Sequence, residues 1–403
     1  MAGALDGIRV LDLSRLLAGP YCAQALGDMG ADVIKVEPPG HGDDIRTWGP
    51  PFLDGGESAY FMSTNRNKRG IVLDLKSDDG RAIVRRLIRD CDVLVENYRP
   101  GTLERWGLGY ADLSGLNPGL VHVSVTGFGQ TGRYRDRPGY DLIAQGMGGL
   151  QAITGTPDGP PVKAGLPVAD LNAGTWAIIG TLMALFARQT TGRGQYVDVS
   201  LLEPQLALHV FNTLMYDKLG VVPGRVGSAH PMIAPYDAFE AADGWLNIAV
   251  GSQKLWHAFC GLLGLDIADD ARFTTNAQRV TNRDDLDALV RPVLRTRTVA
   301  EWQAGLDAAG IPSGPINTLP DLYADPYLEE RDMIVRMPHP TLGTYVGTGF
   351  PVHASGTPGE VRRVPPTLGQ HTAEVLREFG YDDAEIDRLA AGGVLGEPPN
   401  GRD

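Results

Sequence analysis

The chain has 403 residues, of which 43% are hydrophobic and 21% are charged, and its formal net charge is −13. This length predicts two or three folded units of roughly 100–200 residues each, and the composition lacks the apolar depletion of disordered chains. Nucleic acids and anionic membranes would repel such a charge, so we expect neither as a partner. An anionic ligand would need a local basic site.

The three cysteines, Cys22, Cys91 and Cys260, are too few and too widely spaced for a disulfide framework or a metal site. They favour a reducing compartment, and we expect a cytoplasmic protein. The first residues, MAGALDGIRV, lack a basic segment followed by an apolar run. We also expect no membrane segment, because no apolar run reaches the ~18 residues that a span requires.

Strands and helices alternate through the first half of the chain. Apolar runs predict strands over residues 8–13, 31–37, 71–76, 92–97, 120–129 and 196–200. These runs lack strict alternation, which is typical of a parallel sheet covered by helices on both faces. A long apolar helix is predicted over 172–188. The fold class is therefore α/β, with a Rossmann-like large domain built on a parallel sheet.

The pattern changes at about residue 224 to short strands with turn signals, including an Asp243-Gly244 pair that predicts a hairpin. Helices are predicted over 254–263, 283–295 and 299–309, giving a smaller α/β domain. The predicted limits are 1–223 for the N-terminal part of the large domain, 224–331 for the small domain and 332–403 for a C-terminal segment. Periodicity alone does not say whether that segment rejoins the large domain.

Common cofactor motifs do not fit this sequence. Glu37 ends the second predicted strand, where an acidic residue can hold a ribose, but the preceding turn, SRLLAGP, lacks the G-x-G-x-x-G glycines. The sequence also contains no Walker A motif, no H-E-x-x-H and no G-x-S-x-G elbow. Since the eight histidines show no metal-ligand spacing, we predict no metal site.

Two segments allow both a structural and a chemical interpretation. The glycine cluster GFGQTG, residues 127–132, could bring backbone N–H groups to an anion or an acyl carbonyl, or it could simply be a turn after a strand. Asp170 precedes the long apolar helix in LPVADLNAGTW, and such a position favours a helix cap, a role that Asn172 could also fill. Spacing alone does not identify a nucleophile.

Several long segments occur in one order along nearly the whole chain: RVLDLSRLLAGPYCAQALGDMGADVIKVEPPGHGDD, NRNKRGIVLDLK, VENYRPGTLERWGL, GYDLIAQGMGGL, PVADLNAG, TGRGQYVDVSLLE and LGQHT. Together they resemble the class III CoA-transferase family. The resemblance implies that Asp170 is a nucleophile that carries an acyl group and then CoA. It implies coenzyme A thioesters as substrates and no permanently bound cofactor. It also implies an interlocked homodimer whose C-terminal segment returns to the large domain.

The same resemblance suggests further site residues. Tyr140 and Asp141 accompany Asp170 as catalytic candidates. Positions that match the family's CoA-contact regions are Arg15, Leu16, Asn67, Lys68 and Arg105, with Arg99 and Arg69 as further candidates. For any one of these basic residues, a solvated surface charge remains an open alternative.

Departures from related branches refine the expected activity. The racemase branch pairs its aspartate with a histidine and a glutamate, whereas this chain has Tyr140 and Gln253, which cannot transfer protons in that way at neutral pH. Oxalate-using formyl-CoA transferases carry a glutamine where Leu17 stands. The segments GDDIRTWGPPF, NRNK and SAHPMIAPYDAF resemble the succinyl-CoA:dicarboxylate branch. We expect succinyl-CoA as donor and a dicarboxylic acid as acceptor; a 2-methylacyl-CoA racemase and a non-catalytic acyl-CoA-binding protein remain alternatives.

Overall fold

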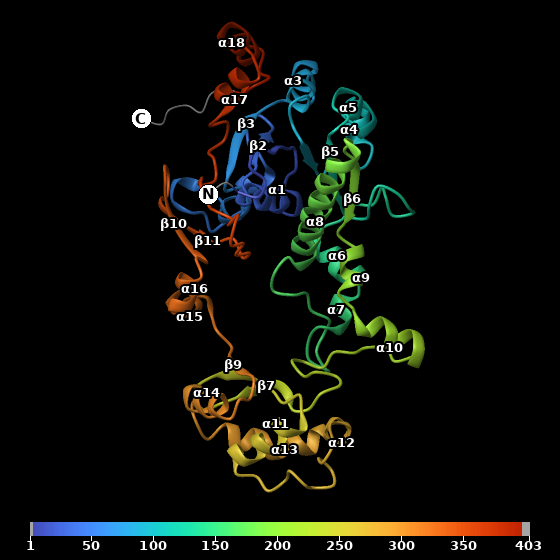
Figure 1. The fold of residues 1–403 in the computed structure, drawn as a ribbon, viewed down its shortest axis with the longest axis vertical. Helices are drawn as coiled ribbons and strands as arrows, with labels where there is room; N and C mark the ends of the chain where they lie inside the picture. The colour runs from blue at the N-terminus through green and yellow to red at the C-terminus, as the bar shows by residue number, and fades with distance from the viewer. Residues whose placement is uncertain (1–2, 397–403) are drawn as a thin grey trace. The chain divides into compact units, whose positions relative to one another are not determined.

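The computed structural model describes residues 3–396, and its contacts divide the chain into two compact units (Figure 1). The first unit comprises Met1–Leu150, Ala164–Phe211 and Tyr327–Asp403, and the second comprises Gln151–Lys163 and Asn212–Pro326. The change of pattern at about residue 224 lies inside the second unit.

A six-stranded sheet forms the centre of the first unit, with the order β3-β2-β1-β4-β5-β6 and parallel pairing throughout. Its strands are β1 (Arg9–Asp12), β2 (Asp32–Glu37), β3 (Lys68–Val72), β4 (Val93–Glu96), β5 (Val121–Thr126) and β6 (Tyr196–Ser200). The predicted α/β class with a parallel sheet is confirmed. Because the strand order reverses between β1 and β4, the carboxyl ends of these two strands border a crevice in which ligands bind in such folds.

Helices cover both faces of this sheet. Successive residues of a strand point to opposite faces, so Val10 packs with one hydrophobic cluster and Leu11 with the other. The first cluster joins the sheet to α1 (Ala18–Asp28) and α8 (Val168–Thr191). The second cluster joins it to α3 (Asp78–Ile88), α5 (Tyr110–Leu116), α17 (Thr372–Glu378) and α18 (Asp383–Ala391). Helices α17 and α18 therefore pack on the same face of the sheet as α3.

Strand β3 begins three residues earlier than the sequence predicts, at Lys68 instead of residue 71. Its first two residues are charged, so the apolar run does not include them. Both are nevertheless buried, because Lys68 pairs with Asp12 on β1 and Arg69 pairs with Asp32 on β2. Buried ion pairs of this kind leave no hydrophobic pattern in the sequence.

Helix α8 begins at Val168, four residues before the predicted start, so Asp170 lies in its first turn. Small buried residues such as Ala173 and Ala177 form the face that packs against α1 and β5. By length and composition alone, α8 is the one helix in the described part of the chain that could cross a membrane, and 39% of its apolar window is buried. The expectation that no stretch is long enough was therefore wrong.

Shorter elements complete the first unit. They are η1 (Asp44–Thr47), η2 (Asp54–Gly56), α2 (Ala59–Thr64), α4 (Thr102–Arg105), α6 (Asp141–Met147), α7 (Leu150–Ile153), α9 (Glu203–Ala207), α10 (Phe211–Leu219), α16 (Pro326–Glu330), and the antiparallel pair β10 (Ile334–His339) and β11 (Gly343–Thr348). Two of these, α7 and α10, run on into the second unit, and α16 begins there.

The second unit is built on an antiparallel sheet of β7 (Tyr236–Glu240), β8 (Trp245–Ala249) and β9 (Ser313–Pro315). The hairpin predicted at Asp243-Gly244 is confirmed by the pairing of β7 with β8. The helices are α11 (Gln253–Leu263), α12 (Asn276–Thr281), α13 (Arg283–Leu294), α14 (Val299–Ala308) and α15 (Leu319–Ala324). Buried aromatic residues, among them Trp256 and Trp302, supply much of its core.

Candidate active site

A cavity of about 200 Å³ opens at the carboxyl ends of β1, β4 and β5 in the first unit. Its walls come from the turn after β1 (residues 15–18), the loop after β4 (97–100), the end of β5 with its following loop (125–127 and 135–140), and the start of α8. The cavity therefore lies where the strand order reverses, as expected for a ligand site in an open parallel sheet.

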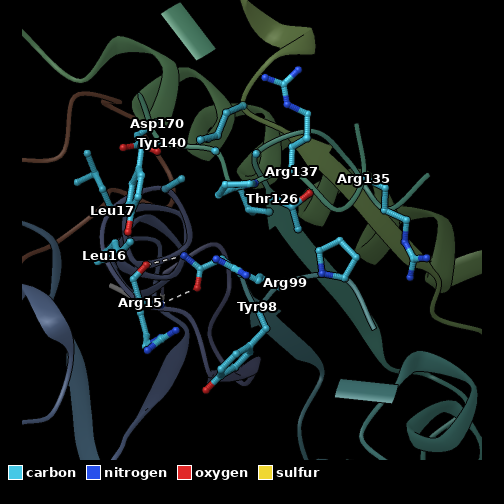
Figure 2. Close-up of a pocket in the computed structure, with 18 of the residues that line it drawn as sticks. Arg15, Leu16, Leu17, Tyr98, Arg99, Thr126, Arg135, Arg137, Tyr140 and Asp170 are labelled. Atoms are coloured by element: carbon cyan, nitrogen blue, oxygen red, sulfur yellow. Dashed lines mark hydrogen bonds between the residues drawn. The ribbon is translucent and has the colours of Figure 1, made fainter. Parts of the chain in front are cut away.

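Asp170 projects from the first turn of α8 into the lining of this cavity (Figure 2). No residue in the described part of the chain donates a hydrogen bond to its carboxylate. Burial, and then the charge of Asp141, raise the pKa of Asp170 to about 7. The helix N-terminus favours the ionised form, but this effect does not prevent the rise. Asp170 is thus an unpartnered carboxyl group that changes charge near neutral pH.

The helix cap is Asp141, which belongs to α6. Its Oδ1 atom accepts hydrogen bonds from the backbone N–H groups of Ala169, at 2.8 Å, and Asp170, at 3.4 Å. Gln145 donates to the other carboxylate oxygen at 2.7 Å and accepts from the N–H of Ala164 at 2.9 Å. The expectation that Asp170 caps this helix was wrong, and Asn172 does not cap it either. Asp141 precedes Asp170 by 29 residues, so no local sequence pattern could reveal that its carboxylate caps this helix.

Aromatic side chains border the cavity near Asp170. Tyr140, 60% exposed, directly precedes α6. Trp48 and Tyr60 also line the cavity and contact each other edge to face, with ring centroids 5.1 Å apart. Burial, and then the charges of Asp170 and Asp141, raise the pKa of Tyr60. Sequence reasoning missed Trp48 and Tyr60, which come from a loop and a short helix far from Asp170 in the chain.

Four arginines line the cavity: Arg15, Arg99, Arg135 and Arg137 (Figure 2). They give this acidic chain a local basic site. Arg105 lies at the border, because a Cβ atom added to Gly101 would be 3.3 Å from Arg105 and 3.6 Å from Arg135. The sequence analysis did not single out Arg135 and Arg137. Their signal is the run RYRDRP, which follows the carboxyl end of β5.

Leu16 and Leu17 form the turn between β1 and α1 on the cavity wall. Leu16 adopts a left-handed backbone conformation with φ of 66°, which is uncommon for a residue with a Cβ atom. Leu17, at the position of the glutamine discussed above, gives this part of the wall an apolar side chain. The structure thus brings the predicted residues Arg15, Leu16, Tyr140 and Asp170 to one cavity. Asp141 does not line the cavity, but it accepts a hydrogen bond from the backbone N–H of Asp170.

Lys68 does not line this cavity. Its ammonium group is fully buried and donates to Asp12 at 2.9 Å, to the carbonyl of Pro20 at 2.8 Å and to Asn65 at 2.9 Å. Burial lowers the pKa of Lys68 to about 8, although the charge of Asp12 opposes this effect. All three of its hydrogen atoms are therefore engaged within the protein.

Asn67 also lies away from the cavity, at the start of β3. It donates to Asp28 and to the carbonyl of Glu360, each at 2.7 Å, and accepts from the N–H groups of Arg362 and Arg363. These contacts attach the C-terminal segment to the sheet. Asn67 thus has a structural role that accounts for all of its polar atoms.

Glu96 and His122 form a second buried pair of titratable groups, on neighbouring strands β4 and β5, with 3.9 Å between their polar atoms. Burial raises the pKa of Glu96 to about 7 and lowers the pKa of His122 to about 3. The imidazole is therefore neutral at pH 7, and the pair is not a strong ion pair. Glu96 accepts a hydrogen bond from the N–H of Tyr98, at 2.7 Å, on the cavity loop.

Gln253, at the position where the racemase branch has glutamate, lies in the second unit at the start of α11. Its side-chain oxygen accepts a hydrogen bond from Arg279 at 3.2 Å.

Comparison with known proteins identifies the family of this chain. The chain matches CoA-transferase family III over residues 5–372. A protein named succinate–glutarate CoA-transferase from Agrobacterium fabrum is 43% identical, over 93% of this chain and 95% of that protein. The succinyl-CoA:glutarate CoA-transferase of Mus musculus is 41% identical, over 97% and 90%.

A solved structure and one further relative extend the comparison. The crystal structure of a CaiB/BaiF family protein from Brucella suis has a TM-score of 0.85 and 40% identity, over 94% of this chain and all of that one. A relative from Acetobacter aceti named acetyl-CoA:oxalate CoA-transferase is 39% identical, over 95% and 97%. The chain belongs to CoA-transferase family III and is a class III CoA-transferase.

Proposed function

We propose that this enzyme transfers CoA from succinyl-CoA to a dicarboxylic acid, with Asp170 as the covalent nucleophile. The observation that carries the proposal is a half-buried carboxyl group without a hydrogen-bond partner in the described part of the chain. It lies in the first turn of α8 and faces a cavity that four arginines also line. A carboxylate that protonates near neutral pH is more basic and a better nucleophile than a solvated aspartate.

In the first half of the reaction, an oxygen of Asp170 attacks the thioester carbonyl and expels the CoA thiolate. This step forms a mixed anhydride between the donor acid and Asp170. The thiolate then attacks the Asp170 carbonyl, releasing the donor as a free carboxylate and leaving CoA attached to the enzyme as a thioester. The acyl activation is retained, so neither ATP nor a metal is required.

In the second half, the carboxylate of the acceptor attacks the enzyme thioester and expels the thiolate again. The resulting anhydride joins the acceptor to Asp170, and the thiolate attacks its acceptor carbonyl. This last step gives the new acyl-CoA and restores the Asp170 carboxylate. Exclusion of water protects both anhydrides, and the apolar side chains of Leu16 and Leu17 on the cavity wall support this role.

The arginines of the cavity would bind the phosphate groups of CoA. Arg15, Arg99, Arg135 and Arg137 line the cavity, with Arg105 next to Arg135, and guanidinium groups bind phosphates through paired hydrogen bonds. The cavity volume of about 200 Å³ is smaller than a typical ligand pocket of ~300–1,000 Å³. We infer that the cavity binds the thioester end of the substrate. The nucleotide end would lie over the loops that carry Arg99, Arg135 and Arg137.

The choice of donor and acceptor rests on the relatives named for succinate and glutarate. To test it, the enzyme is incubated with succinyl-CoA and glutarate, citramalate, mesaconate or oxalate, and the new acyl-CoA is quantified. We expect the longer dicarboxylates to react and oxalate to react poorly. Preferential transfer from acetyl-CoA to oxalate would overturn this choice, and exchange of the 2-hydrogen of a 2-methylacyl-CoA without transfer would support a racemase.

Trapping tests the nucleophile directly. After incubation with succinyl-CoA, borohydride reduces an activated aspartyl group and hydroxylamine converts it to a hydroxamate. Peptide mass analysis should place the modification on Asp170, and Asp170→Ala should give none while still binding CoA. Modification of Asp141 instead, or full transfer activity in Asp170→Ala, would contradict the mechanism.

We further propose that the enzyme is an interlocked homodimer. The support is an exposed apolar face on α8, which includes Trp176, Met183 and Phe186, beside the edge strand β6. Large apolar patches of this kind on a folded chain favour protein contacts. Sedimentation should show a dimer at micromolar concentration, and Phe186→Glu should weaken it. A wild-type monomer under these conditions would contradict the proposal.

A further inference from the structure

The turn between β1 and α1 is held by side chains that come from other parts of the first unit. The carbonyl of Ser14 accepts a hydrogen bond from the ammonium group of Lys35 at 3.0 Å. The N–H of Arg15 donates to Asn97 at 2.8 Å, and the N–H of Leu16 donates to Asp43 at 3.1 Å. Three consecutive residues of the turn, of which Arg15 and Leu16 line the cavity, thus each have a backbone group bound by a distant side chain.

Lys35 and Asp43 are also bonded to each other. The ammonium group lies 3.0 Å from the carboxylate oxygen of Asp43 that Leu16 does not use, and both side chains are fully buried. Further contacts fix the backbone of Asp43, whose N–H donates to the carboxylate of Glu37 at 2.9 Å. Arg46 in turn donates two hydrogen bonds to the carboxylate of Glu37. This arrangement leaves Asp43 little freedom to move.

The turn needs this support because Leu16 is left-handed. A residue with a Cβ atom seldom adopts φ of 66°, and it does so only where the surrounding contacts determine its conformation. The hydrogen bond from the N–H of Leu16 to Asp43 is one such contact. In a free turn, Leu16 would relax toward negative φ, and the side chains on either side of it would turn away from the cavity.

We propose that the buried Lys35–Asp43 ion pair is a positioning device that holds the Arg15–Leu17 turn in its ligand-binding shape before acyl-CoA arrives. This inference rests on the proposed binding of acyl-CoA at this cavity. Neither side chain lines the cavity, so both act through the turn. A buried ion pair is a weak source of stability in general, which agrees with a role in specifying one local conformation.

The Arg66–Asp28 pair supplies a matched control. Its side chains are 4% and 2% exposed, its shortest contact is 2.7 Å, and it belongs to the same unit. Its remaining contacts reach the carbonyls of Thr348 and Gly349 and the side chain of Asn67, not the turn. Removal of either acid therefore leaves a buried cation unpaired, but only one of the two changes should affect the cavity.

The experiment compares Asp43→Ala with Asp28→Ala in the full-length enzyme. We measure KM for succinyl-CoA, kcat, the dissociation constant for free CoA and the thermal midpoint. Asp43→Ala should raise KM and the dissociation constant about tenfold, the effect of losing one hydrogen bond to a charged group, with a smaller change in kcat. Both variants should lower the thermal midpoint by similar amounts, since each leaves a buried cation unpaired, but Asp28→Ala should leave KM unchanged.

Two further variants sharpen the test. Asp43→Asn keeps an oxygen that accepts from Leu16, so it should raise KM less than Asp43→Ala does. Lys35→Met removes the ammonium group from Asp43, and it provides the measurement if Asp43→Ala does not fold. Unchanged KM in Asp43→Ala, or in Lys35→Met where the first variant does not fold, would overturn the inference, as would an equal rise of KM in Asp28→Ala.

The outcome can be separated from that of the proposed function. If Asp170→Ala abolishes transfer while Asp43→Ala keeps the wild-type KM, the nucleophile stands and the positioning role fails. If Asp170→Ala retains transfer, the nucleophile fails, and the dissociation constant for free CoA in Asp43→Ala still decides whether the turn is held by this pair.

Discussion

The half-buried Asp170 and the fully buried Asp12 and Asp43 of the first unit differ in what neutralises them. At the start of α8, Asp170 has no hydrogen-bond partner among the described residues, and its pKa is raised. Asp12, at the end of β1, and Asp43, which caps η1, each pair with a fully buried lysine. Burial opposes ionisation of Asp12, but the charges of Lys68 and Lys35 lower its pKa. The unpaired acid is suited to chemistry, and the paired acids are suited to fixing the backbone.

The largest effect should come from neutralising the unpaired acid. Asp170→Asn should reduce kcat for acyl transfer by about 10³-fold or more, because it removes the nucleophile. Its thermal midpoint should stay the same or rise, since an unpartnered carboxyl leaves a buried position. Transfer kinetics and thermal unfolding measure both effects. A marked loss of stability would show that Asp170 has a structural partner after all.

Breaking a paired acid should have the opposite outcome, with a loss of stability. Lys68→Met removes the bonded partner of the buried Asp12 carboxylate and leaves only the charge of Lys35 to compensate it, so the free energy of unfolding should fall by about 3–5 kcal/mol. The double variant Lys68→Met/Asp12→Asn removes both charges and keeps an acceptor for Ser14, so it should recover most of that loss. Urea unfolding measures the loss of unfolding free energy in each of the two variants. Equal losses in both would mean that the pairing itself contributes little.

Glu96 offers a test through pH. Its pKa of about 7 in the folded chain lies above its ordinary value of 4.5, so the folded state binds more protons between these values. The free energy of unfolding therefore falls as pH rises from about 4.5 to 7. Glu96→Gln should add about 1–3 kcal/mol of stability at pH 8 and almost none at pH 4. An equal gain at both pH values would show that the effect does not come from ionisation.

The smallest effect should come from Asp141, the acid that caps α8. Asn still caps a helix well, so Asp141→Asn should change the free energy of unfolding by less than about 1 kcal/mol. It removes a negative charge that helps to raise the pKa of Asp170. Transfer by the wild type should decline as pH falls through about 7, and in Asp141→Asn this decline should occur at lower pH. A profile of kcat/KM against pH measures the shift, and an unmoved profile would contradict it.

The sequence predicted the sheet well because an apolar run marks each of its strands. All six strands were placed, and only β3 was shifted, because Lys68 and Arg69 hide its start. Asp170 was found through the family resemblance, since its spacing alone favoured a helix cap. What the sequence could not show was convergence in space: the cap from Asp141, the aromatic pair Trp48 and Tyr60, and the burial of Lys68 depend on contacts between distant segments.

The candidate binding residues show the same limit of sequence-based prediction. Arg15 and Leu16 follow a strand that ends at the switch in strand order, where the fold itself creates a ligand crevice. Arg135 and Arg137 follow the end of β5 in the same way, and this position would have been a usable signal. Asn67 precedes its strand and lies at the other end of the sheet. Whether a residue follows the carboxyl end or precedes the amino end of its strand predicted its place in the cavity better than its charge did.

The close approach of Gly127 and Gly139 has a consequence for engineering. A Cβ atom on Gly127 would lie 2.8 Å from the Cα atom of Gly139, so the two ends of the intervening arginine loop meet at a narrow neck. A loop whose ends lie this close can be exchanged as a unit, since the grafted segment need only match the neck. If these arginines bind the nucleotide as proposed, loops from other family members should change nucleotide binding while the reacting end of the cavity stays intact.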